Sequence, residues 1–351
     1  MNVELLPAGS IRSVDVVIPL YNTKDFILEA IQSILDQTYP VNAVLVVDDG
    51  SKDGSPELVE QSFADDPRVR LLRKPHSGLS DTRNHGCRQA TAEYIAFLDS
   101  DDVWEPHKLE MQMALFATSP LRPGVVYCNY SAMTADGSPL ETERIIAPTL
   151  RGQIFDPLLS GNYISGSASA VVLKRELLKQ VGLFDTSLKF AEDWDFWLRL
   201  AHATTFDFAD QPLVRLRRHP NQMQTGHTLT RLIRQVEAQI VIWGKWQEAV
   251  ARNVNAQVVI KENLNCLTTA SDIAPWRLFA CLREIEAMYA RVRPYTFATR
   301  LYGPPFLRPL RLCITMLTYP IKRHIRKLAI KTGFRPLQFL RTARAFFTAA
   351  R

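Results

Sequence analysis

The chain has 351 residues, of which 46% are hydrophobic and 22% are charged, with a formal net charge of +6. This composition is that of an ordinary globular protein, and it excludes a collagen, a coiled-coil rod and a wholly disordered chain. The five cysteines form no CxxC pair, which excludes a zinc ribbon and favours a reducing compartment.

The length predicts about two domains, and a chain this long can bury a core without disulfides. Its first residues lack the basic segment and the long apolar run of a secretory signal. The chain also lacks an uncharged apolar run of about 18 residues, the length that a membrane-spanning helix needs. We therefore expect a cytoplasmic protein.

Apolar strand patterns alternate with helical patterns in the first part of the chain. The predicted strands cover 14–20, 43–47, 69–72 and 94–98, and the predicted helices cover 25–37, 56–64 and 81–91. This alternation favours an α/β fold, with a mostly parallel sheet and helices on both faces. Ligands of such sheets bind at the carboxyl ends of the strands.

The pattern is less regular in the middle of the chain. Strands are expected at 125–130 and 168–173, a strand running into a loop at 213–223, a turn at 135–139, and helices at 174–180 and 191–203. A long helical pattern begins near residue 229, and a further helix is expected at 275–290. We therefore expect a domain of residues 1–228 and a C-terminal helical region of residues 229–351.

Two groups of acidic residues follow two of the predicted strands. Asp48, Asp49 and Asp53 follow the strand at 43–47, and Asp99, Asp101 and Asp102 follow the strand at 94–98. Carboxylates gathered at adjacent strand ends repel one another unless a positive charge offsets them. A divalent cation with substrate phosphates is one such arrangement. The alternative is that both groups are simple turns, which Asp, Gly and Ser favour.

An ordered set of motifs resembles the family 2 glycosyltransferases, which are inverting enzymes. The motifs are VVIPLYN (16–22), SILDQTYP (33–40), VVDDGSKDGS (46–55), HSGLSDTRNHG (76–86), AEYIAFLDSDDVW (92–104), GNYISGSASAVVLKRELLKQVGLFD (161–185), AEDWDFWLRLA (191–201) and RLRRHPNQ (215–222). The resemblance covers about residues 14–223. It implies the GT-A fold, a Rossmann-like nucleotide-diphospho-sugar transferase fold, here with a C-terminal helical extension.

The resemblance implies roles in nucleotide binding for five residues. Pro19 and Tyr21, in the first loop, would pack along the base. Asp49 would accept a hydrogen bond from the base, typically uracil, so a UDP-sugar is the expected donor. Arg83 would neutralise the diphosphate or hold Asp49, and Asp99 would hold the ribose or support a metal ion.

The resemblance also implies a Mn²⁺ or Mg²⁺ cofactor. Asp101, in the DxD motif, would ligate the ion. Asp102 is a weaker candidate for the shell of residues around the ion. His219, with Arg217, resembles the late arginine–histidine motif that closes over the metal ion and the diphosphate.

The EDW motif supplies the expected catalytic base. An inverting transfer needs one carboxylate to take the proton of the acceptor hydroxyl, and Asp193 matches that position, with Glu192 beside it. The alternative is that these acids only mark a helix N-terminus, where negative charge is favourable.

The QxxRW motif of processive relatives is absent after residue 193, so we expect transfer of one sugar or a few. The expected acceptor is a glycan or a lipid-linked glycan. A nucleotidyltransferase is disfavoured because no Gly-rich phosphate loop follows the first strand. A catalytically silent nucleotide-binding scaffold of an envelope polysaccharide assembly complex remains the alternative function.

The C-terminal part of the chain is strongly basic. Arg291–Arg351 holds 14 Lys and Arg residues and no Asp or Glu, so the first 290 residues hold 28 basic and 36 acidic residues. Apolar and cationic positions alternate with helical spacing at 319–330 and 337–350, which predicts binding of residues 305–351 to an anionic membrane surface on the cytoplasmic face. The alternative is a helix packed on the catalytic domain. Nucleic acid is not an expected partner, because no binding motif accompanies the charge.

Overall fold

The computed structural model describes residues 12–142, 145, 147–164, 167–220, 228–256 and 259. The chain divides into two compact units, residues 1–226 and residues 227–351. The expected domains at 1–228 and 229–351 remain predictions. The expected helix at 275–290 and the basic segment 305–351 lie outside the described residues.

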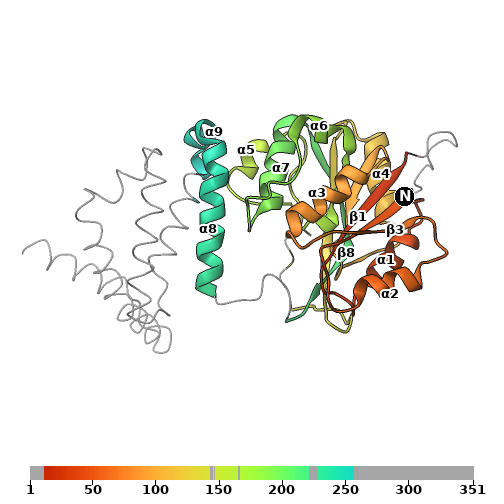
Figure 1. The fold of residues 1–351 in the computed structure, drawn as a ribbon. Coiled ribbons are helices and arrows are strands. Elements are labelled where there is room, and N and C mark those ends of the chain that lie inside the picture. The colour runs from red at the N-terminus through yellow and green to blue at the C-terminus, as the bar shows by residue number, and fades with distance from the viewer. Residues whose placement is uncertain are drawn as a thin grey trace, which may run out of the picture. The chain divides into compact units, whose positions relative to one another are not determined.

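The described part of the first unit is built around an eight-stranded sheet with the order β3-β2-β1-β4-β7-β6-β8-β5 (Figure 1). The strands are β1 Val14–Leu20, β2 Ala43–Asp48, β3 Val69–Arg73, β4 Tyr94–Phe97, β5 Val103–Trp104, β6 Val125–Thr134, β7 Val172–Lys174 and β8 Phe206–Arg218. The half of the sheet formed by β3, β2, β1 and β4 is parallel throughout. The other half is mixed, because β7 pairs antiparallel with β4 and β6, whereas β6 and β8 are parallel.

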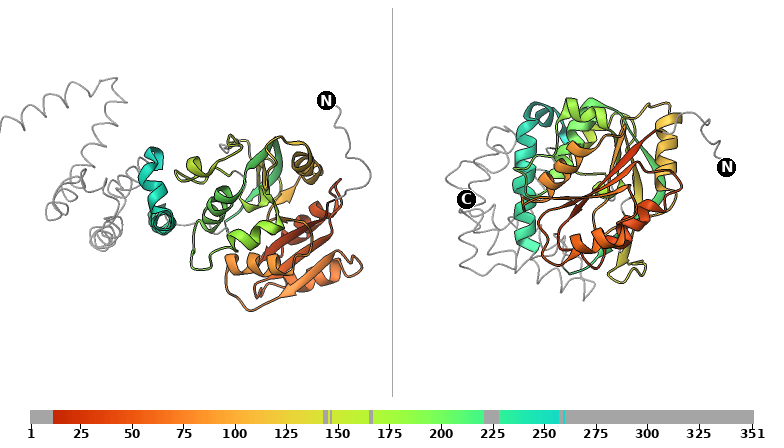
Figure 2. Two further views of the ribbon diagram at one scale, coloured as in Figure 1. Left: turned by 90° about the horizontal axis from the view of Figure 1, so that it is seen from above. Right: turned by 45° about the vertical axis from the view of Figure 1, so that its right-hand side comes forward.

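Helices cover both faces of the sheet, as the sequence predicts. The helices of this unit are α1 Ile27–Leu35, α2 Ser55–Ser62, α3 Leu79–Gln89, α4 Lys108–Thr118, α5 Phe155–Leu158, α6 Leu178–Val181 and α7 Glu192–Ala203, with 3-10 turns at Ala168–Ala170 and Arg175–Leu177. The right-hand view of Figure 2 shows α3 and α1 on opposite sides of β1. At Gly86 of α3, an added Cβ would lie 2.4 Å from a methyl group of Val17, so this glycine permits the close approach of α3 to β1.

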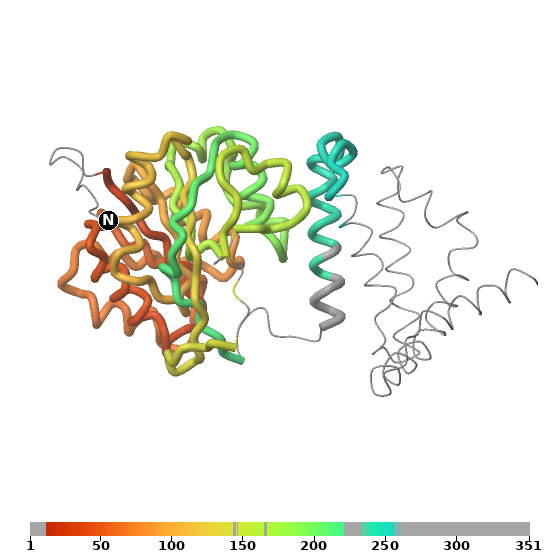
Figure 3. Tube along the Cα trace, turned by 180° about the vertical axis from the view of Figure 1, so that it is seen from behind, coloured from red at the N-terminus to blue at the C-terminus, as the bar shows by residue number. Residues whose placement is uncertain are grey.

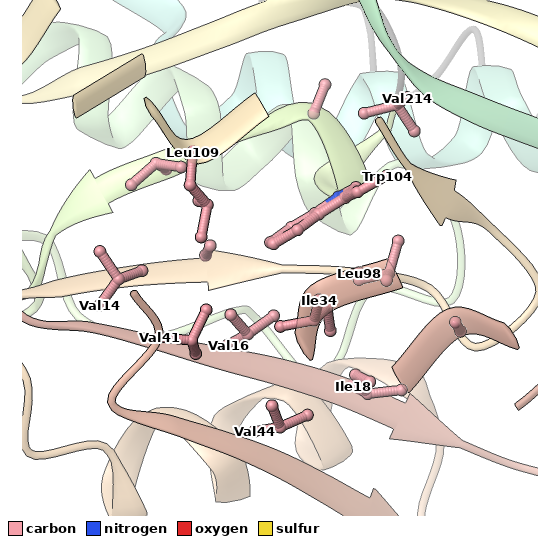
Figure 4. Close-up of a cluster of buried hydrophobic side chains, with 14 of the residues drawn as sticks. Val14, Val16, Ile18, Ile34, Val41, Val44, Leu98, Trp104, Leu109 and Val214 are labelled. Atoms are coloured by element: carbon pink, nitrogen blue, oxygen red, sulfur yellow. The ribbon is translucent and has the colours of Figure 1, made fainter. Parts of the chain in front are cut away.

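The core on the α1 side of the sheet is continuous. Ile27, Ala30, Ile31 and Ile34 lie on one face of α1 and are fully buried, as the helical spacing of these apolar residues predicts. They pack against alternate residues of β1, among them Val16 and Ile18, and against Trp104 (Figure 4). This apolar layer holds the first two strands and α1 as one rigid support for the loops that follow the strands.

Four segments differ from the sequence predictions. The strand expected within 213–223 begins earlier, at Phe206, and runs beside β6, as the yellow and green tubes of Figure 3 show. The register of this pair is irregular at Asn129. Only the second half of the strand expected at 168–173 is extended, because Ala168–Ala170 forms a 3-10 turn. The helix α4 and the short strand β5 were not predicted, and α4 buries a lysine and a glutamine in its apolar face.

Pro19 lies inside β1 and is buried, whereas the sequence analysis expects it in the first loop. The main-chain oxygen of Val17 accepts a hydrogen bond from Leu98 on the β4 side, and that of Leu20 accepts one from Asp49 on the β2 side. The alternation of the strand therefore turns the Pro19 nitrogen toward the β4 side. There the last paired residue of β1 is Val17, so no ladder hydrogen bond is lost.

The described part of the second unit consists of α8 Thr228–Lys245 and α9 Gln247–Arg252. Ile240, Ile242 and Trp243 of α8 are buried, and Val250 of α9 is buried. The predicted start of a long helix near residue 229 is therefore confirmed. None of the described helices has the length and the hydrophobicity that crossing a bilayer requires.

Candidate functional site

The loops that follow β1, β2 and β4 lie at one edge of the sheet, because these three strands are adjacent and parallel. Side chains and main-chain groups join the loops directly. Thr23 Oγ1 donates a hydrogen bond of 2.9 Å to Ser100 Oγ, and the amide of Asn22 donates one of 3.0 Å to Ser51 Oγ. The residues predicted to bind a nucleotide are therefore carried by loops that are fixed to one another.

Asp49, which follows β2, is only 3% exposed and is surrounded by donors. Its Oδ1 accepts from Lys74 Nζ at 2.5 Å and from the Ser77 amide at 2.8 Å. Its Oδ2 accepts from the Gly78 amide at 2.9 Å. Burial by itself raises the pKa of Asp49, but these three donors outweigh it and hold the pKa below its ordinary value. Asp49 is therefore a permanent carboxylate.

Tyr21 lies just past the end of β1 and exposes 48% of its surface. Its ring stacks on the imidazole of His76, with ring centroids 4.5 Å apart and planes inclined by 29°. The same imidazole lies against Asp49, with Nδ1 2.9 Å from Oδ2. Tyr21 and Asp49 thus contact the same imidazole from two loops.

Arg83 of α3 lies in the interior, with its side chain 2% exposed. One guanidinium nitrogen is 2.7 Å from Asp99 Oδ1, at the end of β4, and another is 3.0 Å from Glu192 Oε1, at the start of α7. Burial lowers the pKa of Arg83, but Asp99 and Glu192 outweigh that effect and raise it above its ordinary value. Arg83 was expected either at the diphosphate or on Asp49; in the structure Lys74 binds Asp49, and Arg83 joins the DxD loop to the EDW helix.

Asp101 and His219 are brought together from distant parts of the chain. His219 Nε2 lies 3.0 Å from Asp101 Oδ2, and the ring of His219 packs on Phe26 with centroids 4.8 Å apart. Arg217 lies beneath this pair, with its side chain 2% exposed. Its guanidinium donates to the main-chain oxygens of Asp101 and Ala135 and pairs with Glu29. Arg217 therefore holds the main chain of Asp101 in place and is turned away from solvent.

Asp102 is buried, with 4% of its surface exposed. Its oxygens accept from Ser169 Oγ at 2.7 Å and from the Arg217 amide at 3.1 Å. Burial, followed by the nearby Asp101 and Asp99, raises the pKa of Asp102 well above its ordinary value. The structure thus places this predicted metal-shell residue where it ties the DxD loop to β8 and to the turn at Ala168–Ala170.

The six carboxylates of the two acidic groups do not gather into one cluster. Asp48 accepts from the Ser51 amide at 2.9 Å, and Asp53 accepts from the amide and hydroxyl of Ser55, so these two acids shape their own turn. Within the described ranges, no group of three or more His, Cys, Asp or Glu residues is arranged to hold a metal ion. Asp48 and Asp53 thus stabilise their own turn, as the turn alternative describes, whereas the negative charges of Asp101 and Asp99 still act on Asp102.

Asp193 lies in the first turn of α7, directly after Glu192. Its Oδ2 accepts from Asn162 Nδ2 at 3.1 Å, and its Oδ1 accepts from the Trp194 amide at 2.7 Å. Burial and the charge of Glu192 raise the pKa of Asp193 to about 6, although Arg83 and the two donors oppose the rise. A carboxylate with this pKa is suited to accept a proton near neutral pH.

Lys74, His76 and Asn162 contact predicted site residues but are not themselves among the residues that the sequence motifs predict. Lys74 and His76 lie in the segment before α3. The HSG motif is the sequence feature that could have identified His76 as a site residue. Asn162 lies in a loop that is 31 positions before Asp193, and nothing in the local pattern couples the two. Such contacts between loops follow from the folded chain.

The model of the family described as Glycosyl transferase family 2 matches residues 15–182. The chain is 31% identical over 229 residues to an uncharacterized glycosyltransferase of Rickettsia typhi, a match that covers 64% of this chain and 69% of that protein. It is 32% identical over 188 residues to a putative teichuronic acid biosynthesis glycosyltransferase, TuaG, of Bacillus subtilis, covering 53% of this chain and 71% of the relative. Matches to longer Rickettsia relatives span only about a third of their length.

The fold is similar to that of residues 1–349 of TarS from S. aureus, crystallised in complex with UDP-GlcNAc. The TM-score is 0.62 and the identity is 17%, with 92% of each chain covered. At this identity the likeness concerns the fold, and it confirms the GT-A arrangement that the sequence motifs predict.

Proposed function

The chain belongs to glycosyl transferase family 2, and from this premise we propose an inverting, metal-dependent transfer of one sugar from a UDP-sugar to a hydroxyl group. The observation that carries the proposal is the double ion pair of Arg83. It joins Asp99, at the edge where nucleotides bind in such sheets, to Glu192, the neighbour of the proposed base. Donor site and base are thereby parts of one connected structure.

The base of the nucleotide would bind between Tyr21 and Asp49. Tyr21 offers an exposed ring for stacking, and Asp49 is an acceptor for a ring N–H. Pro19 is buried in β1, so it would shape the loop that follows and would not contact the base. Asp99, held by Arg83 and 3.2 Å from Ser167 Oγ, would accept from the ribose hydroxyls.

Mn²⁺ or Mg²⁺ would be held by Asp101 and His219. A carboxylate oxygen and an imidazole nitrogen 3.0 Å apart fit two ligand positions of one ion, and phosphate oxygens of the donor would supply further ligands. When bound, the ion supplies positive charge that stabilises the leaving diphosphate. Arg217 and Asp102 would serve this pair indirectly, by fixing the loop that carries Asp101.

Asp193 would act as the base. The acceptor oxygen forms a bond to the anomeric carbon while its proton passes to Asp193, and the bond between that carbon and the phosphate oxygen breaks with its electron pair leaving on the nucleoside diphosphate. A single displacement of this kind inverts the configuration at the anomeric carbon. Glu192 is paired with Arg83, so it would keep Arg83 in place while Asp193 takes the proton.

We propose a glycan or a lipid-linked glycan as the acceptor, and a cytoplasmic location at the membrane surface. The basic segment 305–351 that would bind anionic lipid lies outside the described residues. Flotation of the full chain and of a chain ending at residue 304 with anionic liposomes tests this part. Equal flotation of both chains would contradict it.

The transfer itself is tested with the purified full chain, a panel of UDP-sugars, and Mn²⁺ or EDTA. We expect UDP release that requires the ion and that Asp193→Asn reduces by about 10²-fold or more. Asp136→Asn, an exposed acid in the turn after β6, is the matched control and should release UDP at the rate of the unmodified chain. Equal traces of UDP from the unmodified chain and Asp193→Asn would favour the catalytically silent scaffold.

A further inference from the structure

Four donor groups lie against the carboxylate of Asp49. Lys74 Nζ and the Ser77 amide donate to Oδ1, and the Gly78 amide donates to Oδ2. His76 Nδ1 lies 2.9 Å from Oδ2, and its hydrogen bond goes to the Asp49 main-chain oxygen at 3.1 Å. A nucleotide base that binds Asp49 must therefore displace one of these four groups.

Two of the four donors are fixed by the main chain. The amides of Ser77 and Gly78 lie at the start of α3, where Gly78 is the residue before the first helical turn. Lys74 is held as well, because its ammonium group also contacts the main-chain oxygen of Pro75 and the carboxylate of Asp81, and its side chain is 9% exposed. Loss of either amide or of Lys74 would disturb several contacts at once.

His76 is the donor that can leave. Its side chain is 57% exposed, and it contacts the Tyr21 ring and Asp49. Nδ1 is 2.9 Å from Asp49 Oδ2 and 3.1 Å from the Asp49 main-chain oxygen, so this nitrogen carries the proton. The main chain of His76 is seated against Gly50, whose φ of +75° and missing side chain allow that approach. The ring can thus rotate away while the loop stays in position.

The two contacts of His76 are those that a nucleotide base would make at this position. A flat ring stacks on Tyr21, and a ring nitrogen lies 2.9 Å from the carboxylate of Asp49. Taking the proposed donor site as given, we propose that His76 fills the place of the base in the free protein, and that a uracil ring must displace it to bind. His76 is thereby a residue that sets the affinity for the donor.

The proposal predicts the direction in which a substitution changes nucleotide affinity. Removing the imidazole leaves Tyr21 and Asp49 free in the unbound protein, so nucleotide binding no longer replaces an existing stack and hydrogen bond. We expect His76→Ala to bind UDP about tenfold more tightly, which corresponds to about 1.4 kcal/mol. His76→Asn keeps a small donor but loses the ring, and its affinity should fall between the two.

The experiment is calorimetric titration of the full chain with UDP in the presence of Mn²⁺, for the unmodified protein, His76→Ala, His76→Asn and His107→Ala. His107 is an exposed histidine that pairs with Glu110, so its removal controls for the loss of an imidazole and should leave the dissociation constant unchanged. If the unmodified protein binds UDP and His76→Ala binds it with equal or weaker affinity, the role of His76 is overturned and the proposed function stands. Failure of all four proteins to bind UDP overturns the donor site itself.

A second measurement does not depend on any change in stability. The ring protons of His76, identified by their loss in His76→Ala, should resonate upfield in the free protein because the ring lies on Tyr21. Saturation with UDP should move them to the positions of an exposed histidine. Ring protons that stay upfield in the UDP complex would show that the imidazole remains on Tyr21 and would overturn the proposal.

Discussion

Arg83 and Glu192 are 109 positions apart in the sequence, and their side chains form an ion pair of 3.0 Å inside the protein. The same guanidinium holds Asp99 at 2.7 Å. One buried cation therefore connects α3, the loop after β4 and the first turn of α7. Because both partners are carboxylates, the charge of each depends on Arg83 for compensation.

Replacing Arg83 should be strongly destabilising. Arg83→Met leaves Asp99 and Glu192 without their cation, and we expect a loss of about 3–5 kcal/mol in the free energy of unfolding, measured by urea denaturation. The matched control is Arg68→Met, which breaks the partly exposed Arg68–Asp66 pair of 2.7 Å. That change should cost no more than about 1 kcal/mol. Similar losses in the two variants would contradict the structural role of Arg83.

The pH dependence of transfer should report Asp193. A base acts in its deprotonated form, and the pKa of Asp193 is raised to about 6. We expect kcat/KM to rise with pH up to about 6 and then to level off, with about a tenfold loss for each pH unit below that value. The check is a pH profile with the donor at low concentration. A profile that stays flat down to pH 4.5 would remove Asp193 from this role.

Asn162 should shift this profile. Its Nδ2 donates to Asp193 Oδ2 at 3.1 Å, and this hydrogen bond lowers the pKa of Asp193. In Asn162→Ala the pKa should rise, so the acid limb of the pH profile should move to higher pH by a few tenths of a unit to one unit. Tyr163→Phe, at the neighbouring position, serves as the control and should keep the original limb. An unmoved limb with reduced kcat would mean that Asn162 acts on the acceptor.

Lys108 should make stability depend on pH in the alkaline range. It is fully buried at the start of α4, with Nζ 2.8 Å from Gln112 Oε1 and 3.8 Å from the centroid of the Trp104 ring. Burial lowers its pKa from 10.5 to about 8. Between these values the unfolded chain binds more protons than the folded one, so stability should rise with pH in this window.

The comparison with Lys108→Met isolates this contribution. Relative to that variant, the unmodified protein should gain up to about 3 kcal/mol between pH 8 and pH 10.5, measured by urea denaturation at several pH values. Lys52→Met, at an exposed position, is the control and should follow the unmodified protein. Parallel stability curves for the unmodified protein and Lys108→Met would show that burial does not lower the pKa of Lys108.

Local sequence patterns were sufficient to predict the strands and helices of the parallel half of the sheet. The strand β1 is continuous in apolar and β-branched residues, and the helix α1 presents its isoleucines with helical spacing, so both elements are visible in short windows of sequence. The helix α4 was missed because its buried face includes Lys108 and Gln112, which have no apolar signature. The strand β8 was predicted too short because Asp207 and Pro212 interrupt its pattern, although β6 pairs with both sides of the interruption.

The sequence by itself determined which chemical groups stand at the strand ends. The order of the motifs placed Tyr21, Asp49, Asp99 and Asp101 in loops after parallel strands, and parallel strands bring such loops to one edge. It also placed Asp193 in the first turn of a helix. Each of these conclusions depends on neighbours within a few residues.

Only the tertiary structure decided which of these groups touch. The pairs Asp101–His219, Arg83–Glu192 and Lys74–Asp49 join residues that are 118, 109 and 25 positions apart. Asp49 pairs with Lys74, and Arg83 pairs with Glu192. These pairings depend on how α3 packs against β1 and on where α7 begins. Ion pairs over such separations form only when the packed core has placed both elements, because no local backbone preference can bring the two side chains together.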